Sequence, residues 1–100
     1  MSDDDKPLPF EAVKKAMPRH VEEFCRRYLG DGKKGGGWWL CRSPFREDRN
    51  PSFGVSLSTG HWKDFARPDE NGDLIDLLAK LDKCTNVEAV KRLALMMRVS

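Results

Sequence analysis

The chain has 100 residues, of which 39% are hydrophobic, and its formal net charge is +2. This composition favours a folded domain with one modest core, and no apolar run is long enough to span a membrane. The acidic start MSDDDK does not resemble a signal peptide, so we expect a cytoplasmic location. Three widely spaced cysteines (Cys25, Cys41 and Cys84) favour reduced thiols over a disulfide framework.

The N-terminal part of the chain is predicted to be helical after a disordered tail over residues 1–6, and residues 7–100 are predicted to form a single domain. Apolar residues at helical spacing predict a helix from Phe10 to Met17. Pro18 suits the first turn of a second helix, which ends near Gly30. The stretch GDGKKGGG, residues 30–37, is predicted to be a flexible basic loop.

Three strands are predicted next, from WWLCR (38–42), SFGVSL (52–57) and HWKDF (61–65). The turn STG joins the last two as a hairpin, and ARPDENG (66–72) is predicted to be a loop. An apolar stripe from Leu74 to Leu81 predicts a helix, and Thr85 with Glu88 forms the capping pattern of another. The inward face of this last helix is predicted to contain Val87, Val90, Leu93, Ala94 and Met97. These elements predict an α+β fold, with a small antiparallel sheet flanked by N-terminal and C-terminal helices.

Three blocks of sequence occur at a specific spacing: SPFREDRNPSFGVS (43–56), HWKDFARPDENGDLIDLLAKL (61–81) and NVEAVKRLALMM (86–97). In these blocks the chain resembles the zinc-binding domain of bacterial DNA primases, the CHC2-type zinc-ribbon family. Members of that family contain Cys-Pro-Phe-His, then Pro-Ser-Phe, then a Cys-x-x-Cys knuckle and Gly-Asp before an apolar helix. The resemblance extends from about Leu8 to Met97 and implies a zinc-ribbon-like sheet.

The chain departs from the family at the four zinc-ligand positions, which the resemblance places at Ser43, Arg46, Asp64 and Arg67. Zinc requires thiolate, neutral imidazole or carboxylate ligands, whereas serine is a poor ligand and arginine stays protonated. We therefore expect a domain without zinc or another cofactor. A rearranged zinc site built from Cys41, His61 and Asp64 is the alternative.

In the family, zinc joins the loop that corresponds to Ser43 and Arg46 with the turn that corresponds to Asp64 and Arg67. Without zinc, these two loops need another connection. We expect an ion pair of Asp64 with Arg46 or Arg67 to provide it. If such a pair is exposed, it contributes roughly 1 kcal/mol or less, so apolar packing has to supply most of the stability.

The resemblance implies a role in binding single-stranded template, and the residues support this independently. Single-strand binding needs cations along a groove and aromatic rings on which bases stack. Successive strand residues face opposite sides, so one of Trp38 and Trp39 is expected in the core and the other on the surface. The predicted nucleic-acid-binding residues are Lys33, Lys34, Trp38, Trp39, Arg42, Arg46, Arg49, Trp62 and Lys63.

No catalytic constellation is present in the sequence, so the chain is not expected to be an enzyme by itself. It is expected to serve as an accessory or N-terminal module of a DNA primase, in a phage, plasmid or other mobile element. The expected partners are single-stranded DNA and a replication polymerase, primase or helicase subunit. A rival interpretation is a protein-interaction module that docks onto such a subunit, and the sequence does not separate DNA from RNA.

Overall fold

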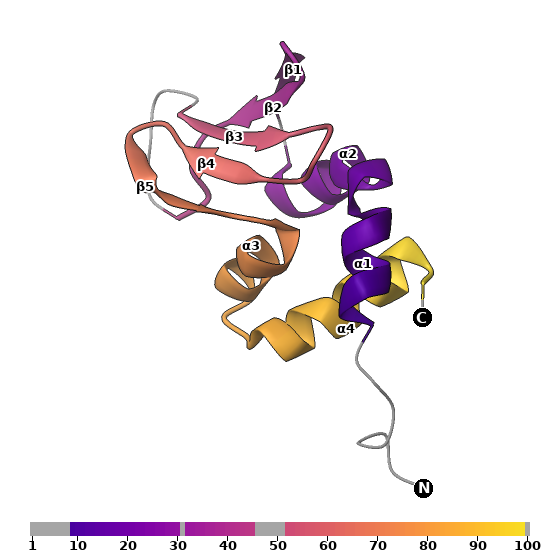
Figure 1. Cartoon of the computed structure of the whole chain (residues 1–100). Helices are drawn as coiled ribbons and strands as arrows, with labels where there is room; N and C mark the ends of the chain where they lie inside the picture. The colour runs from indigo at the N-terminus through magenta and orange to yellow at the C-terminus, as the bar shows by residue number, and fades with distance from the viewer. Residues whose placement is uncertain (1–8, 31, 46–51, 100) are drawn as a thin grey trace, which may run out of the picture.

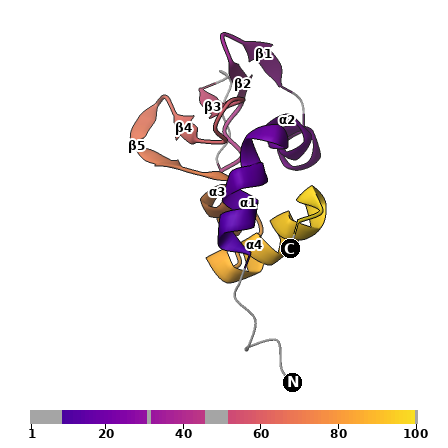
Figure 2. The same ribbon diagram turned by 45° about the vertical axis from the view of Figure 1, so that its right-hand side comes forward.

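A five-stranded sheet lies above two C-terminal helices, and two short N-terminal helices run along one side (Figures 1 and 2). The computed structural model describes residues 9–30, 32–45 and 52–99, apart from the side chain of Pro68. This architecture confirms the predicted α+β class.

The N-terminal helical region is more divided than the sequence predicts. Four short segments follow one another: α1 (Phe10–Ala16), the 3₁₀ turn η2 (Met17–Arg19), α2 (Val21–Phe24) and the π-helical turn η3 (Cys25–Leu29). Pro18 lies in η2, where its missing N–H interrupts the helical hydrogen bonds. The region ends at Gly30, as predicted, with φ at +73°.

The sheet is an antiparallel meander in the order β1-β2-β3-β4-β5. Its strands are β1 (Lys33–Gly35), β2 (Trp38–Cys41), β3 (Phe53–Ser56), β4 (Trp62–Asp64) and β5 (Arg67–Gly72). The predicted β3–β4 hairpin is confirmed, with Val55 opposite Trp62.

The prediction is wrong for the two edge strands, β1 and β5, because it assigned both segments to loops. In β1, Lys34 pairs with Trp39, and the turn to β2 uses Gly36 and Gly37 at φ +58° and +83°. Two positive φ angles in a two-residue turn match the twist of a tight hairpin. An edge strand buries little and tolerates proline, which explains why neither strand has an apolar alternation that sequence reasoning could detect.

The C-terminal helices are α3 (Leu74–Leu81) and α4 (Asn86–Met97). A capping box begins α3: Asp73 accepts hydrogen bonds from the backbone N–H of Ile75 and Asp76 at 2.9 and 3.1 Å, and its own N–H donates to Asp76. Thr85 caps α4, as the sequence predicts. Most of the predicted inward face of α4 is buried, but Val87 is 39% exposed, so its assignment to the core is wrong. It lies in the first turn of α4.

Candidate nucleic-acid interface

The inner face of the sheet belongs to the hydrophobic core. Trp39, Val55 and Trp62 lie side by side across β2, β3 and β4, and each is at most 3% exposed. The Nε1–H groups of both tryptophans are buried without a partner among the described residues. Neither ring presents a face to solvent, so the structure removes Trp39 and Trp62 from the predicted binding set.

The outer face of the sheet is formed by the alternate residues of the same strands. Leu40 lies opposite Gly54, which lies opposite Lys63, and Lys33 is the neighbour of Leu40 on the other side. Trp38 is on this face and is half-buried, and Arg42 is exposed just after β2. Of the two adjacent tryptophans, Trp38 is therefore the one on the surface.

An aromatic pair stands on this outer face. The rings of Trp38 and Phe65 have centroids 5.7 Å apart in an edge-on arrangement, and Phe65 is 45% exposed. Gly54 lies beneath both rings: a Cβ there would be 2.8 Å from Phe65 and 3.1 Å from Trp38. The missing side chain allows the rings to rest on β3. Phe65 is not among the residues that the sequence predicts to bind nucleic acid.

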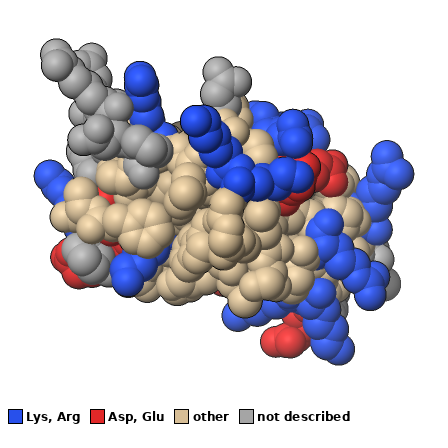
Figure 3. Space-filling model, turned by 90° about the horizontal axis from the view of Figure 1, so that it is seen from above, with Lys and Arg blue, Asp and Glu red and all other residues tan. Residues whose placement is uncertain are grey.

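Cations lie on the same face of the sheet as the aromatic pair. Lys33 and Arg42 are exposed and Lys63 is half-buried, and Lys and Arg outnumber Asp and Glu on the face seen in Figure 3. Lys34 differs from them, because it points to the inner side and its Nζ lies 3.0 Å from Glu22 of α2. That carboxylate has a lowered pKa through its hydrogen bonds with Lys34 and Arg26. The predicted residues Arg46 and Arg49 lie outside the described residues.

Two of the positions that the resemblance assigns to zinc ligands, Ser43 and Asp64, accept hydrogen bonds from the backbone. Ser43 is 5% exposed, and its Oγ accepts a hydrogen bond from the Phe45 N–H at 3.2 Å. Asp64 is 1% exposed, and its Oδ1 accepts from the N–H groups of Ala66 and Arg67 at 2.9 and 3.2 Å. Arg67 thus contacts Asp64 through its backbone. The expected ion pair with Arg46 falls outside the described residues and stays a prediction.

These positions do not fit zinc. Among the described residues, no three His, Cys, Asp or Glu side chains lie close enough to hold a metal ion, so Cys41, His61 and Asp64 do not assemble. Asp64 and Cys41 are buried on the core face, while His61 is exposed. Burial raises the pKa of the Cys41 thiol to about 11 and that of Cys25 to about 12, so both stay protonated at neutral pH.

An aromatic cluster packs next to Ser43 and Asp64. Phe53 and Trp62 stack with centroids 5.4 Å apart, and Phe45 lies 6.0 Å from Phe53 and 6.1 Å from Trp62. The Nζ of Lys80, on α3, lies 4.7 Å from the centre of the Phe45 ring and 5.5 Å from that of Trp62. Cation–π contacts of this kind contribute about 0.5–1 kcal/mol where exposed. The cluster connects the loop after β2, the β3–β4 hairpin and α3.

Sequence and fold comparisons agree with this architecture. The model of the family described as CHC2 zinc finger matches residues 11–100. The chain belongs to the CHC2 zinc-finger family. A DNA primase of Streptomyces coelicolor is 38% identical over 84 residues, which are 84% of this chain and 13% of that protein. The structure of the Aquifex aeolicus primase, comprising its zinc-binding and RNA polymerase domains, superposes with a TM-score of 0.79 at 23% identity.

That superposition covers 95% of this chain and 23% of the Aquifex chain. This CHC2 domain therefore spans only a small part of the primases it matches. Within the described residues, no helix is long and apolar enough to cross a membrane. The chain has the fold of the CHC2 family, and the four positions that the resemblance assigns to zinc ligands are Ser43, Arg46, Asp64 and Arg67.

Proposed function

We propose that this chain is the template-binding module of a primase-type replication system and that it binds single-stranded DNA on the outer face of its sheet. The observation that supports this most directly is the Trp38–Phe65 pair, held on Gly54 with cations on the same face of the sheet. Exposed rings provide stacking faces for bases, and nearby Lys and Arg side chains neutralise phosphates.

The proposed set of DNA-contacting residues differs from the set that the sequence predicts. It contains the two rings and the cations Lys33, Arg42 and Lys63, while Arg46 and Arg49 remain candidates from the sequence. Lys34 is left out because it is engaged with Glu22. Nucleotidyl transfer is proposed to come from another part of the primase, since the match covers 13% of the Streptomyces protein.

We also propose that the domain functions without zinc. Serine and arginine replace the expected ligands, and the Asp64 carboxylate is already occupied by two backbone N–H groups. The aromatic cluster around Trp62 supplies a connection between the knuckle loops that needs no metal.

A titration with a fluorescently labelled oligothymidine at two salt concentrations tests the DNA proposal. We expect Lys33→Ala and Lys63→Ala to weaken binding and to flatten its salt dependence, because fewer counterions are released. Trp38→Ala should weaken binding at every salt concentration, by roughly 1–3 kcal/mol per stacked base. Lys34→Ala is the matched control and should change affinity little.

Two results would contradict the proposal. One is undetectable binding at low salt by the folded wild-type chain, which would favour the protein-interaction alternative. The other is an equal loss of affinity in the Lys34 and Lys33 variants, which would move the site away from the outer face. Parallel assays with labelled oligouridine decide between DNA and RNA. Primer synthesis by the purified chain alone would contradict the assignment of nucleotidyl transfer to another part.

A further inference from the structure

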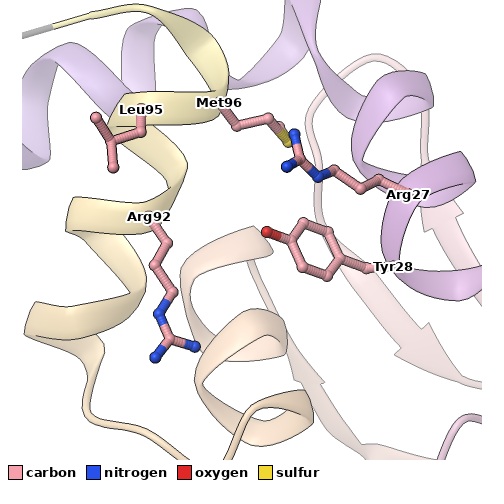
Figure 4. Close-up of a pocket in the computed structure, with 5 residues that line it drawn as sticks. All are labelled: Arg27, Tyr28, Arg92, Leu95 and Met96. Atoms are coloured by element: carbon pink, nitrogen blue, oxygen red, sulfur yellow. The ribbon is translucent and has the colours of Figure 1, made fainter.

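A pocket lies between η3 and the C-terminal half of α4. Its volume is about 260 Å³, and Arg27, Tyr28, Arg92, Leu95 and Met96 line it. Figure 4 shows the Arg27 guanidinium and the Met96 thioether pointing toward one another, with the Tyr28 hydroxyl directed at α4. Figure 1 shows α4 below the sheet, and none of the five lining residues belongs to a strand.

The walls of the pocket combine exposed apolar surface with an unusual backbone. Leu95 is 81% exposed, the highest exposure of any large hydrophobic side chain among the described residues. Arg27 and Tyr28, which also line the pocket, belong to the π-helical turn η3. Single π-helical turns are rare and occur frequently at functional sites.

The two segments that form the pocket are basic. Residues 25–29 include Arg26 and Arg27, residues 91–98 include Lys91, Arg92 and Arg98, and neither segment contains an acid. Arg27 forms no ion pair or side-chain hydrogen bond with another described residue; its guanidinium lies 6.0 Å from the Tyr28 ring centre. Arg92 uses Nη1 to bind Asp82 at 2.6 Å, and its other guanidinium nitrogens have no hydrogen-bond partner among the described residues.

We propose that this pocket docks an acidic peptide segment of a partner protein. A large apolar side chain of the segment would contact Leu95 and Met96, while flanking Asp or Glu carboxylates would bind Arg27 and Arg92. Guanidinium groups suit this role because they bind carboxylates in a bidentate manner. The apolar side chain and the pocket shape favour a peptide over nucleic acid, whose bases stack on flat aromatic faces.

Selection from a random peptide library displayed on phage, with the complete chain immobilised, tests this inference. The selected sequences should be enriched in Asp and Glu around one large apolar residue. A labelled synthetic copy of the best sequence should then lose about tenfold or more in affinity when Leu95→Asp or Arg27→Glu is introduced. Both side chains are exposed, so neither substitution should unfold the chain.

Two controls separate this surface from the proposed DNA site. Arg27→Lys preserves the charge and should weaken peptide binding less than Arg27→Glu. Lys63→Glu, on the outer sheet face, should leave peptide affinity unchanged while reducing oligothymidine binding. Three outcomes would overturn the inference: no enriched motif, a motif whose binding survives both Leu95→Asp and Arg27→Glu, or loss of oligothymidine binding in those two variants. The result does not depend on whether the DNA proposal holds.

Discussion

Gly54 shows how a single residue can determine the surface of this domain. Any Cβ at this position would meet the rings of Phe65 and Trp38 at 2.8 and 3.1 Å, closer than ordinary van der Waals contact. Glycine in a strand is normally unfavourable, by roughly 0.5–1 kcal/mol relative to alanine. Its presence here in β3 permits the close approach of two aromatic rings, and this arrangement creates the surface proposed to stack bases.

Gly54→Ala should therefore separate binding from stability. The added methyl displaces the Phe65 ring, which is 45% exposed and can turn toward solvent. We expect oligothymidine affinity to fall several-fold, while the free energy of unfolding changes by no more than about 1 kcal/mol. Paired binding titrations and urea unfolding curves measure the two effects. An unchanged affinity would show that the Trp38–Phe65 arrangement does not contribute to binding.

The turn from β4 to β5 is the element in which a carboxylate occupies a position that the resemblance assigns to a zinc ligand. Asp64 is buried at the end of β4, and one of its oxygens accepts two backbone N–H groups from the turn that follows. In the sequence this residue was expected to act through an arginine side chain. The structure adds a backbone role, which fixes the conformation of the turn and the position of Phe65 within it.

Asp64→Ala should be more damaging than removal of an exposed ion pair. It leaves two backbone N–H groups without their acceptor, and hydrogen bonds to charged groups contribute about 1.5–3 kcal/mol. We expect a loss of about 2–3 kcal/mol in the free energy of unfolding, measured by urea denaturation. Asp64→Asn retains a side-chain oxygen acceptor and should cost less. Equal losses in both variants would indicate that the charge, and not the turn, determines stability.

Over the whole molecule, a single hydrophobic core holds the sheet and the helices together. In a zinc ribbon, a bound metal ion also connects parts of the sheet. The inner face of the sheet packs Trp39, Phe53 and Trp62, and α1, α3 and α4 contribute buried residues to the same core. The stacked Phe53–Trp62 pair, with Phe45 and Lys80, joins the knuckle loops to α3. Structural zinc in small domains can provide most of the folding free energy. The proposal of a zinc-free domain therefore requires that this packing is sufficient by itself.

The chain should therefore fold without zinc. We expect elemental analysis of the purified protein to find far less than one zinc per chain, and a chelator to leave its thermal unfolding midpoint unchanged. The physical reason is the absence of a suitable donor set, described above. Stoichiometric zinc together with unfolding by the chelator would contradict this prediction. A control with a zinc-dependent CHC2 domain shows that the chelator treatment is effective.

The sequence by itself determined much of this protein, for physical reasons that act locally. Alternation in β2, β3 and β4, the apolar stripe of α3 and the Thr85 cap of α4 depend on neighbouring residues and were predicted. The spacing of the Pro-Phe, Pro-Ser-Phe and Gly-Asp motifs likewise indicated the CHC2 family, which the family match over residues 11–100 confirmed.

Only the tertiary structure decided which surfaces are exposed. Alternation places Trp38 and Trp39 on opposite faces, but the position of the helices decides that Trp39 is buried. The edge strands β1 and β5 form because neighbouring strands supply their hydrogen-bond partners, a contribution absent from local propensity. The pocket beside Leu95 arises where η3 meets α4, two segments far apart in the chain, and their juxtaposition depends on packing of the whole core.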